Sequence, residues 1–467
     1  MAALIAILPF EIWDHILSYC TFWDKMRFRQ ICKSALRLKI TKLPHCFYYC
    51  CTSDHFKRLN SKIINKLTDL KTLIIPEFEN EKCRNYLSNL TYLTQLVIEK
   101  HKSITLPAMN LYDLKLDSVR NIYGLNLQTR LTHLILNGVV NFKKFDFQFL
   151  LNLRRLKMRQ CFHINWENFS LLTNLQSLDI SGGGYSELYV NNLTNLVELN
   201  PDAQNIQKID GLTNLTSLLS THKLDDKKFL NIIKLNKLYL NSPGIYNLSN
   251  LKQLEELHIV YDMSLDLTDD GITDLTKLTK LFIFGSKIRK IGHLTNLKEL
   301  QLVSVPIKNE ELKSLTKLES LVLGFDTAIT DITHLTNLTN LKSTNNIKNH
   351  QLKLLNKLQR LDCEKGIKNI ENLINLTSLH IYPGLEEESL RALTNLQDVT
   401  FHCNNFEHLK YLSNITRLET NHHCTKNAQH LLFTRLTNLQ IIRNCRDPLV
   451  HQKLRDQKRH IIENYDL

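Results

Sequence analysis

Histidine and cysteine are the residues of this sequence whose spacing first suggests chemistry, because imidazole and thiolate groups bind zinc. The segment PHCFYYCCTSDH, residues 44–55, contains five of them: His45, Cys46, Cys50, Cys51 and His55. The spacing of Cys46 and Cys50 fits one half of a structural zinc site, but no second pair with that spacing follows. We therefore expect a packed connector in this segment and no metal site.

Other candidate sites have weaker patterns. A late group of potential ligands lies near successive predicted strands, where plain surface positions are the simpler interpretation: His402, Cys403, His422, His423 and Cys424. The loop SGGGY, residues 181–185, lacks the helix and lysine that follow a phosphate-binding loop, so it predicts a tight turn. The sequence contains no nucleophile elbow, paired-cysteine redox motif or H-E-x-x-H motif. It predicts a non-catalytic protein without a cofactor, although groups distant in sequence can still meet in space.

Composition favours an intracellular folded protein. Of the 467 residues, 43% are apolar, and no run of about 18 apolar residues predicts a membrane span. The eleven cysteines are odd in number and irregularly spaced, and no signal peptide precedes them, which favours free thiols in the cytoplasm or nucleus (of a host cell, if the protein is viral). Several N-x-T triplets, such as Asn214-Leu215-Thr216, have the form of glycosylation sites but would have no such role in that compartment.

The net charge of +13 is concentrated at the front of the chain. Residues 1–66 contain eleven Lys and Arg and four Asp and Glu, a balance of +7, whereas the body from 67 to 442 carries only +4. A nucleic-acid-binding protein would be expected to concentrate positive charge on its working surface. The distribution therefore does not favour nucleic acid as the partner of the body, although the basic 25–66 region could contact an acidic lipid or nucleic acid.

The body from about 67 to 447 repeats one phrase about nineteen times, at steps of 18 to 24 residues, with L-T-N-L and L-T-K-L as its commonest forms. In LTNLKELQLVSVPIKNEEL, residues 294–312, Leu300 and Leu302 are two apart and point to one face of a short strand. Further apolar residues mark where the chain turns around the same core: Leu294, Leu297, Val305, Ile307 and Leu312. One coil cannot bury these side chains alone, so stacked coils and a parallel sheet are predicted.

This pattern resembles that of the leucine-rich-repeat family. The resemblance implies an α/β solenoid, a horseshoe with the parallel sheet on its concave face. The family's usual Asn or Cys, three residues after the second strand leucine, is held here by Cys161, Asn346 and Asn404. Most other repeats have a different residue in this slot, so we expect main-chain rearrangements, waters or irregular coils to satisfy the inward-facing backbone groups.

The stretch LPFEIWDHILSYCTFWDKMRFRQICKS, residues 8–34, does not follow the repeat and predicts short helices with wide apolar faces. Pro9 and Glu11 suit a helix start. The stretch resembles an F-box motif over about residues 5–42, with departures at Lys25 and Ala35. The resemblance implies a small all-helical domain that docks the linker subunit of a cullin-type ubiquitin ligase. By position, the docking residues would be Leu8, Pro9, Ile12, Ile16, Leu17, Ile31 and Cys32.

One candidate surface for a target protein lies in the middle of the array. Three consecutive repeats place Tyr239, His258 and Phe282 between their two strand leucines, and Val260 and Phe284 follow two positions after the latter two. Stacked coils would align these residues as a partly aromatic patch, and exposed aromatic clusters tend to mark binding surfaces. The simpler alternative is that single exposed apolar residues carry no function or are covered by loops.

Together these features predict a front helical domain over 1–45, a connector over 46–66, the solenoid over 67–447 and a terminal capping helix over 448–467. The predicted function is a substrate-recognition adaptor of a ubiquitin ligase, with the linker subunit and cullin scaffold at the front and an unknown target protein on the concave face. The alternative is a stand-alone binding solenoid whose front helices only cap its end, because solenoid ends need capping.

Overall fold

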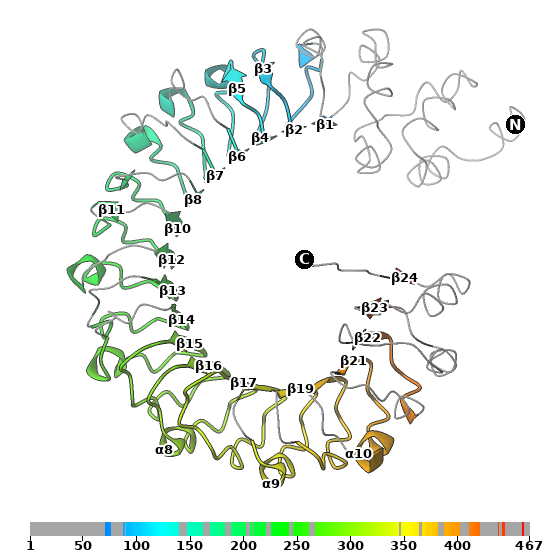
Figure 1. Cartoon of the computed structure of the whole chain (residues 1–467). Helices are drawn as coiled ribbons and strands as arrows, with labels where there is room; N and C mark the ends of the chain where they lie inside the picture. The colour runs from blue at the N-terminus through cyan, green and yellow to red at the C-terminus, as the bar shows by residue number, and fades with distance from the viewer. Residues whose placement is uncertain are drawn as a thin grey trace, which may run out of the picture. The chain divides into compact units, whose positions relative to one another are not determined.

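The structure is a computed structural model, which describes residues 71–75, 87–88, 90–139, 147–161, 169–182, 188–201, 206–207, 209–220, 226–241, 245, 247–260, 267–344, 347–363, 367–381, 387–401, 411–420, 438, 441–443 and 460–461. The chain divides into two compact units, Met1–Lys223 and Leu224–Leu467. Each unit is a stack of coils in which the strands lie on the inner side of the curve (Figure 1).

In the first unit, a parallel ladder joins one strand from each successive coil: β1 (Thr72–Ile75), β2 (Gln95–Glu99), β4 (Asp113–Asp117), β6 (His133–Asn137), β7 (Arg155–Arg159), β8 (Ser177–Ser181), β10 (Glu198–Pro201) and β12 (Ser217–Ser220). Away from this sheet, β3 (Ser103–Thr105) pairs with β5 (Asn121–Tyr123), and β9 (Leu188–Tyr189) with β11 (Ile206–Gln207). Short 3₁₀ turns complete three coils: η3 (Leu125–Leu127), η4 (Phe147–Phe149) and η5 (Phe169–Leu171).

The second unit repeats the arrangement with β13 (Lys237–Leu240), β14 (Glu256–Ile259), β15 (Lys280–Phe284), β16 (Glu299–Val303), β17 (Ser320–Leu323), β18 (Asn340–Ser343), β19 (Arg360–Cys363), β20 (Ser378–Ile381), β21 (Asp398–Phe401), β22 (Arg417–Thr420), β23 (Ile441–Arg443) and β24 (His460–Ile461). Its outer side carries η6 (Asp226–Phe229), η7 (Asp270–Ile272) and the short helices α8 (Asn309–Leu312), α9 (Asn349–Leu352) and α10 (Glu387–Ala392). The predicted parallel-sheet solenoid is confirmed for this part of the chain.

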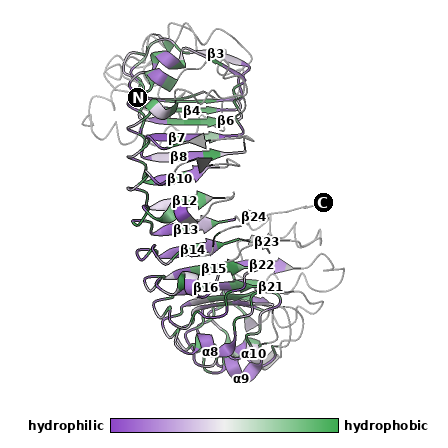
Figure 2. Cartoon of the chain, turned by 90° about the vertical axis from the view of Figure 1, so that its left-hand side faces the viewer, coloured by the Kyte–Doolittle hydropathy of each residue, from purple (hydrophilic) through white to green (hydrophobic). Residues whose placement is uncertain are grey.

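The core consists of leucines stacked coil upon coil. In β16, Leu300 and Leu302 are buried, whereas the alternate residues Glu299, Gln301 and Val303 remain partly accessible on the other face. Both kinds of residue occur along the strands in Figure 2. The five turn residues predicted for this coil are all buried: Leu294, Leu297, Val305, Ile307 and Leu312. Each fully buried leucine contributes roughly 1.5–3 kcal/mol of transfer free energy, so the repeat itself explains the fold.

The asparagine of the L-T-N-L phrase and its variants ties each coil to the one before it. Its Nδ2 donates to a main-chain carbonyl about one repeat earlier, over 2.8–3.4 Å, at Asn110, Asn152, Asn174, Asn195, Asn214, Asn296, Asn337, Asn375, Asn395, Asn414 and Asn438. In four of these coils the threonine two residues later adds a second bond, as Thr339 Oγ1 does to the Glu319 carbonyl at 3.0 Å. The N-x-T triplets that have the form of glycosylation sites thus act as clamps between coils.

At the other end of the strands, the main chain performs the role expected of the family's Asn. Residues directly after several strands adopt the left-handed conformation, among them Lys100 at φ 54° and Ser304 at φ 52°. Their N–H groups donate to the next coil, Lys100 to the Asp117 carbonyl at the end of β4 at 2.7 Å and Ser304 to the Phe325 carbonyl just after β17 at 2.8 Å. This is one of the main-chain rearrangements that the missing Asn slot predicts.

Cys161 occupies the family's slot as the sequence indicates. Its buried thiol donates to the carbonyl of Leu136 in the preceding coil at 3.4 Å, and burial raises its pKa to about 11. The other two residues predicted for this slot, Asn346 and Asn404, lie outside the described residues.

The end of the chain differs in part from the expected terminal helix. His460–Ile461 is extended and pairs in parallel with β23. The unpaired N–H and C=O groups of a terminal strand favour such an addition. The rest of 448–467, the front domain 1–45 and the connector 46–66 lie outside the described residues, as do both groups of potential zinc ligands.

Candidate aromatic binding surface

Three coils of the second unit align the rings of Tyr239, His258 and Phe282. Strand pairing places Tyr239 beside His258 and His258 beside Phe282, because each occupies the middle position between two buried strand residues. The ring centroids of Tyr239 and His258 are 4.1 Å apart at an interplanar angle of 25°, and those of His258 and Phe282 are 4.1 Å apart at 31°. The predicted alignment is therefore present, and stacked rings add roughly 0.5–1.5 kcal/mol to the burial of their surface.

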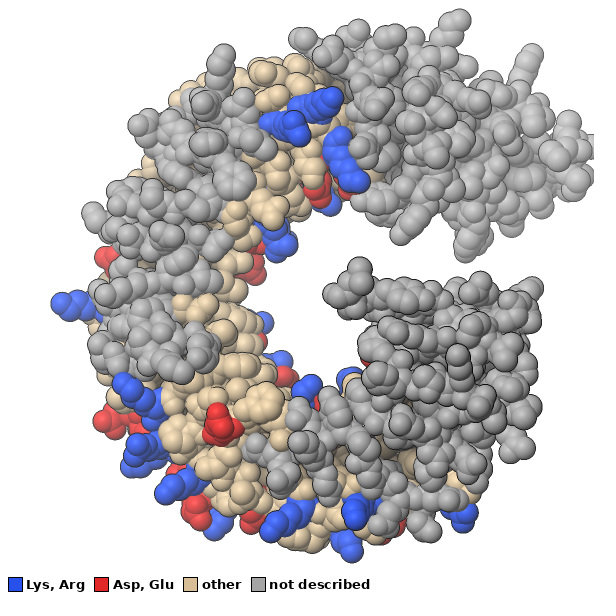
Figure 3. All heavy atoms as spheres, viewed as in Figure 1, with Lys and Arg blue, Asp and Glu red and all other residues tan. Residues whose placement is uncertain are grey.

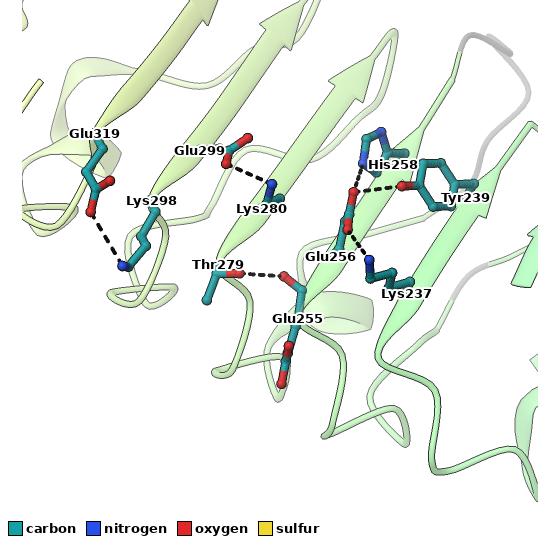
Figure 4. A network of polar contacts seen from close by, with 10 residues as sticks. All are labelled: Lys237, Tyr239, Glu255, Glu256, His258, Thr279, Lys280, Lys298, Glu299 and Glu319. Carbon is teal, nitrogen blue, oxygen red and sulfur yellow. Dashed lines mark hydrogen bonds and ion pairs between the residues drawn. The ribbon is translucent and has the colours of Figure 1, made fainter. Parts of the chain in front are cut away.

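Glu256 anchors this stack from the first position of β14 (Figure 4). Its Oε1 accepts a hydrogen bond from the Tyr239 hydroxyl at 2.7 Å and lies 2.8 Å from His258 Nε2. Lys237 Nζ lies 3.5 Å from Oε2. Glu256 was not predicted from the sequence, although its place two residues before His258, on the same strand face, was a usable signal.

The protonation states follow from burial and from this carboxylate. Burial, followed by the hydrogen bond to Glu256, raises the pKa of Tyr239 to about 12. Burial also lowers the pKa of His258, which outweighs the opposing effect of Glu256. Burial alone would raise the pKa of Glu256, but the hydrogen bonds from Tyr239 and His258 and the charges of His258 and Lys237 lower it. At neutral pH the ionised Glu256 carboxylate therefore accepts hydrogen bonds from the Tyr239 phenol and from the neutral imidazole of His258.

The stack continues as an apolar surface along the neighbouring strands. Val260 follows β14 and is 42% exposed, and the partly accessible Phe284 pairs in register with Val303. Beyond them Phe325 is 63% exposed. Val260 and Phe284 were predicted from the sequence, but Val303 and Phe325 were not. Val303 occupies the position of Phe284 in the next coil, where the middle position is the polar Gln301, and Phe325 lies beyond the end of β17.

Gly324, which has no side chain, allows Val303 to pack closely against the next coil. A Cβ placed on Gly324 would lie 2.5 Å from Val303 Cγ2, so only glycine allows the valine to lie against the next coil. Val303 is branched at Cβ and has little rotational freedom to move away.

Charged pairs border the patch at the first strand positions and at the residues just before them. Lys280 Nζ lies 2.8 Å from Glu299 Oε1, and Lys298 Nζ lies 3.5 Å from Glu319 Oε1. The side-chain hydrogen bond to Glu299 raises the pKa of Lys280. Such exposed pairs contribute little to stability, so they chiefly surround the rings with polar groups.

The arrangement offers packing and hydrogen bonding to a ligand. The raised pKa of Tyr239 disfavours the phenolate, and the carboxylate of Glu256 is engaged by three neighbours. Within the described ranges, no group of three or more His, Cys, Asp and Glu residues is placed to hold a metal ion. In the same part of the chain, no helix has the length and apolarity needed to cross a membrane.

The linker-docking residues predicted at the front of the chain lie outside the described residues: Leu8, Pro9, Ile12, Ile16, Leu17, Ile31 and Cys32. Comparison with known domain families nevertheless identifies this region. Residues 5–39 match the F-box domain, which confirms the resemblance read from the sequence.

Similarity to solved structures concerns the solenoid. A leucine-rich-repeat protein of Leptospira interrogans is 19% identical, over 92% of this chain and 98% of its own, with a TM-score of 0.52. TLR13, solved as a complex with ssRNA13, is 17% identical, over 82% of this chain and 69% of its own, with a TM-score of 0.52. A search of curated protein sequences found no match. At these identities the likeness shows the fold alone, a leucine-rich-repeat solenoid.

Proposed function

We propose that this chain, an F-box domain followed by a leucine-rich-repeat solenoid, is a non-catalytic substrate adaptor of a cullin-type ubiquitin ligase. The observation that carries the proposal is the F-box match at residues 5–39, on the N-terminal side of a repeat array. An F-box implies a linker subunit as partner, and through it the cullin scaffold. Ubiquitin transfer itself would be performed by the partner subunits.

The adaptor would bind its two partners through different surfaces. At the front, the Leu-Pro entrance and the apolar helix faces of the F-box bind the linker subunit. On the strand face, the stack of Tyr239, His258 and Phe282, extended by Val260 and Phe284, binds a target protein. The surface is partly apolar and partly hydrogen-bonding, the combination that dominates protein–protein contacts.

The mechanism is an increase in effective concentration. A target held by the solenoid and a ligase held by the F-box become parts of one assembly, so the transfer step no longer depends on diffusional encounter. No group of this chain has to take part in the chemistry.

Two variants of the full chain test both surfaces and control for each other. Leu8→Ala with Ile16→Ala should abolish retention of a co-expressed linker subunit and leave target capture unchanged. Tyr239→Ala with Phe282→Ala and Phe284→Ala should have the opposite effect. Circular dichroism of both variants checks that the solenoid remains folded.

The outcomes separate the proposal from its alternative. If the unaltered chain retains no linker subunit, the stand-alone binding solenoid is the correct function and the front helices are a cap. If the triple variant captures the same proteins as the unaltered chain, the aromatic stack is not the target site.

A further inference from the structure

Strand β7 carries an unusual concentration of positive charge. Its sequence RLKMR buries Leu156 and Met158, so Arg155, Lys157 and Arg159 all point to the accessible face of the sheet. Arg154 directly precedes them in the turn and is also exposed. Four of six consecutive residues are therefore cations on or beside one strand.

Among the described residues, one carboxylate forms ion pairs with members of this group of four cations. Asp179 on β8 places Oδ2 2.7 Å from Lys157 Nζ and 3.6 Å from Arg159 Nη2, and its Oδ1 accepts from Asn200 at 2.9 Å. Within the part of the chain that the structure describes, Arg154 and Arg155 have no acidic partner. On the other side, β6 (HLILN) contains no Asp or Glu, and Asp113 of β4, the strand beyond it, is paired with His133 Nδ1 at 2.8 Å.

The strand-face lysines of the second unit differ from the cations of β7 in their pairing. These lysines each have a carboxylate of their own, as Lys237 has Glu256, Lys280 has Glu299 and Lys342 has Asp362. On the outer rim of the second unit too, at the lower left of Figure 3, basic and acidic side chains lie interspersed. Alternate residues of a strand are only about 6.6 Å apart, so the unmatched cations of β7 repel one another unless an anion is bound.

We infer that the accessible face of β7, formed by Arg154, Arg155, Lys157 and Arg159, binds a short acidic stretch of a protein target. The inference rests on the proposed function for the idea that the solenoid holds a protein. Arginine recognises a carboxylate through two parallel hydrogen bonds, which gives geometry as well as charge.

The surroundings of β7 set the length of the anion. Two strands away on one side, β4 presents Asp113 and Asp117, and two strands away on the other, β10 begins with Glu198. At about 4.8 Å between strands, a long polyanion crossing the sheet would meet these carboxylates. An extended acidic peptide of about six residues lying along β7 would not, because it spans the same length as residues 154–159. A short acidic peptide therefore fits this face better than a nucleic acid strand that crosses the sheet.

Fluorescence anisotropy of the full chain with a labelled hexaglutamate peptide tests this site. Arg155→Glu with Arg159→Glu should weaken peptide binding by at least about tenfold, because two attractive charges become repulsive. Lys290→Glu with Lys313→Glu is the matched control, since both lysines are exposed and the change in net charge is the same. The control should weaken binding less than about twofold.

A third variant gives a gain that structural damage would not produce. Asp179→Asn removes the competing carboxylate from Lys157 and Arg159, so peptide binding should become tighter. Equal losses in the two charge-reversal variants, or no binding of hexaglutamate, would overturn the inference. Tighter binding of single-stranded oligouridine than of the peptide, lost in the Arg155 and Arg159 variant, would assign the face to nucleic acid instead. None of these results depends on retention of the linker subunit, so they leave the ligase proposal to its own test.

Discussion

At the scale of single residues, one histidine has an environment that makes it sensitive to pH. His258 is enclosed between Tyr239 on β13 and Phe282 on β15, with Glu256, Lys280 and Glu299 as the charged groups around it. Burial lowers its pKa below the ordinary 6.5, so the unfolded chain takes up this proton more readily than the folded one. Its contribution to stability is therefore complete above pH 6.5 and declines as the pH falls below that value.

Replacing His258 with Phe should remove this pH dependence and keep a ring in the stack. We expect the urea midpoint of the unaltered chain to fall more steeply than that of His258→Phe between pH 7.5 and about 5. Glu256 does not confuse the comparison, because its lowered pKa places its own loss of stability below its ordinary 4.5. Parallel curves for the two proteins over this range would show that the ring titrates as it does in the unfolded chain.

At the scale of the structural element, the strand and its preceding turn form the unit that repeats. Asn337 Nδ2 donates to the Thr316 carbonyl at 2.8 Å, and Thr339 Oγ1 donates to that of Glu319 at 3.0 Å. Both bonds connect one coil to the preceding one, so the phrase provides coil-to-coil hydrogen bonds as well as buried leucines.

Asn337→Ala and Thr339→Val should each lower the free energy of unfolding by about 1 kcal/mol, because each leaves a carbonyl with one donor fewer. Thr336→Ala is the matched control: it lies in the same L-T-N-L phrase, is exposed, and should change stability by less than about 0.5 kcal/mol. Urea unfolding measures all three. If Thr336→Ala costs as much as Asn337→Ala, the phrase stabilises the turn in some way other than through these bonds.

The same elements show why prediction succeeded for the core and fell short for the polar groups. The spacing of Leu300 and Leu302 fixes a strand face by geometry alone, and the same rule aligns Tyr239 with Phe282. The partner of Tyr239 depends instead on register, since Glu256 occupies a different position of the next coil. Likewise, the asparagines that bond successive coils, such as Asn337, lie before the strands. The family pattern instead places its asparagine three residues after the second strand leucine.

At the scale of the whole molecule, stability should be a sum of coils and of the interfaces between neighbouring coils. Each strand that the structure describes pairs only with strands of adjacent coils, so within the second unit β15 pairs with β14 and β16 but not with β21. Damage to one coil is therefore expected to open its neighbours and to leave distant coils protected.

Leu281→Ala tests this locality, because Leu281 is fully buried in β15 and its truncation should cost about 2–5 kcal/mol. Hydrogen exchange should accelerate most in β14, β15 and β16 and least in β21 and β22, whereas the exposed Thr276→Ala should leave all five strands unchanged. Uniform acceleration across β13 to β22 would mean that the unit unfolds as a single cooperative block. The distinction matters for target binding, since a locally opened coil at Phe282 would disrupt the aromatic stack while the rest of the unit still held its fold.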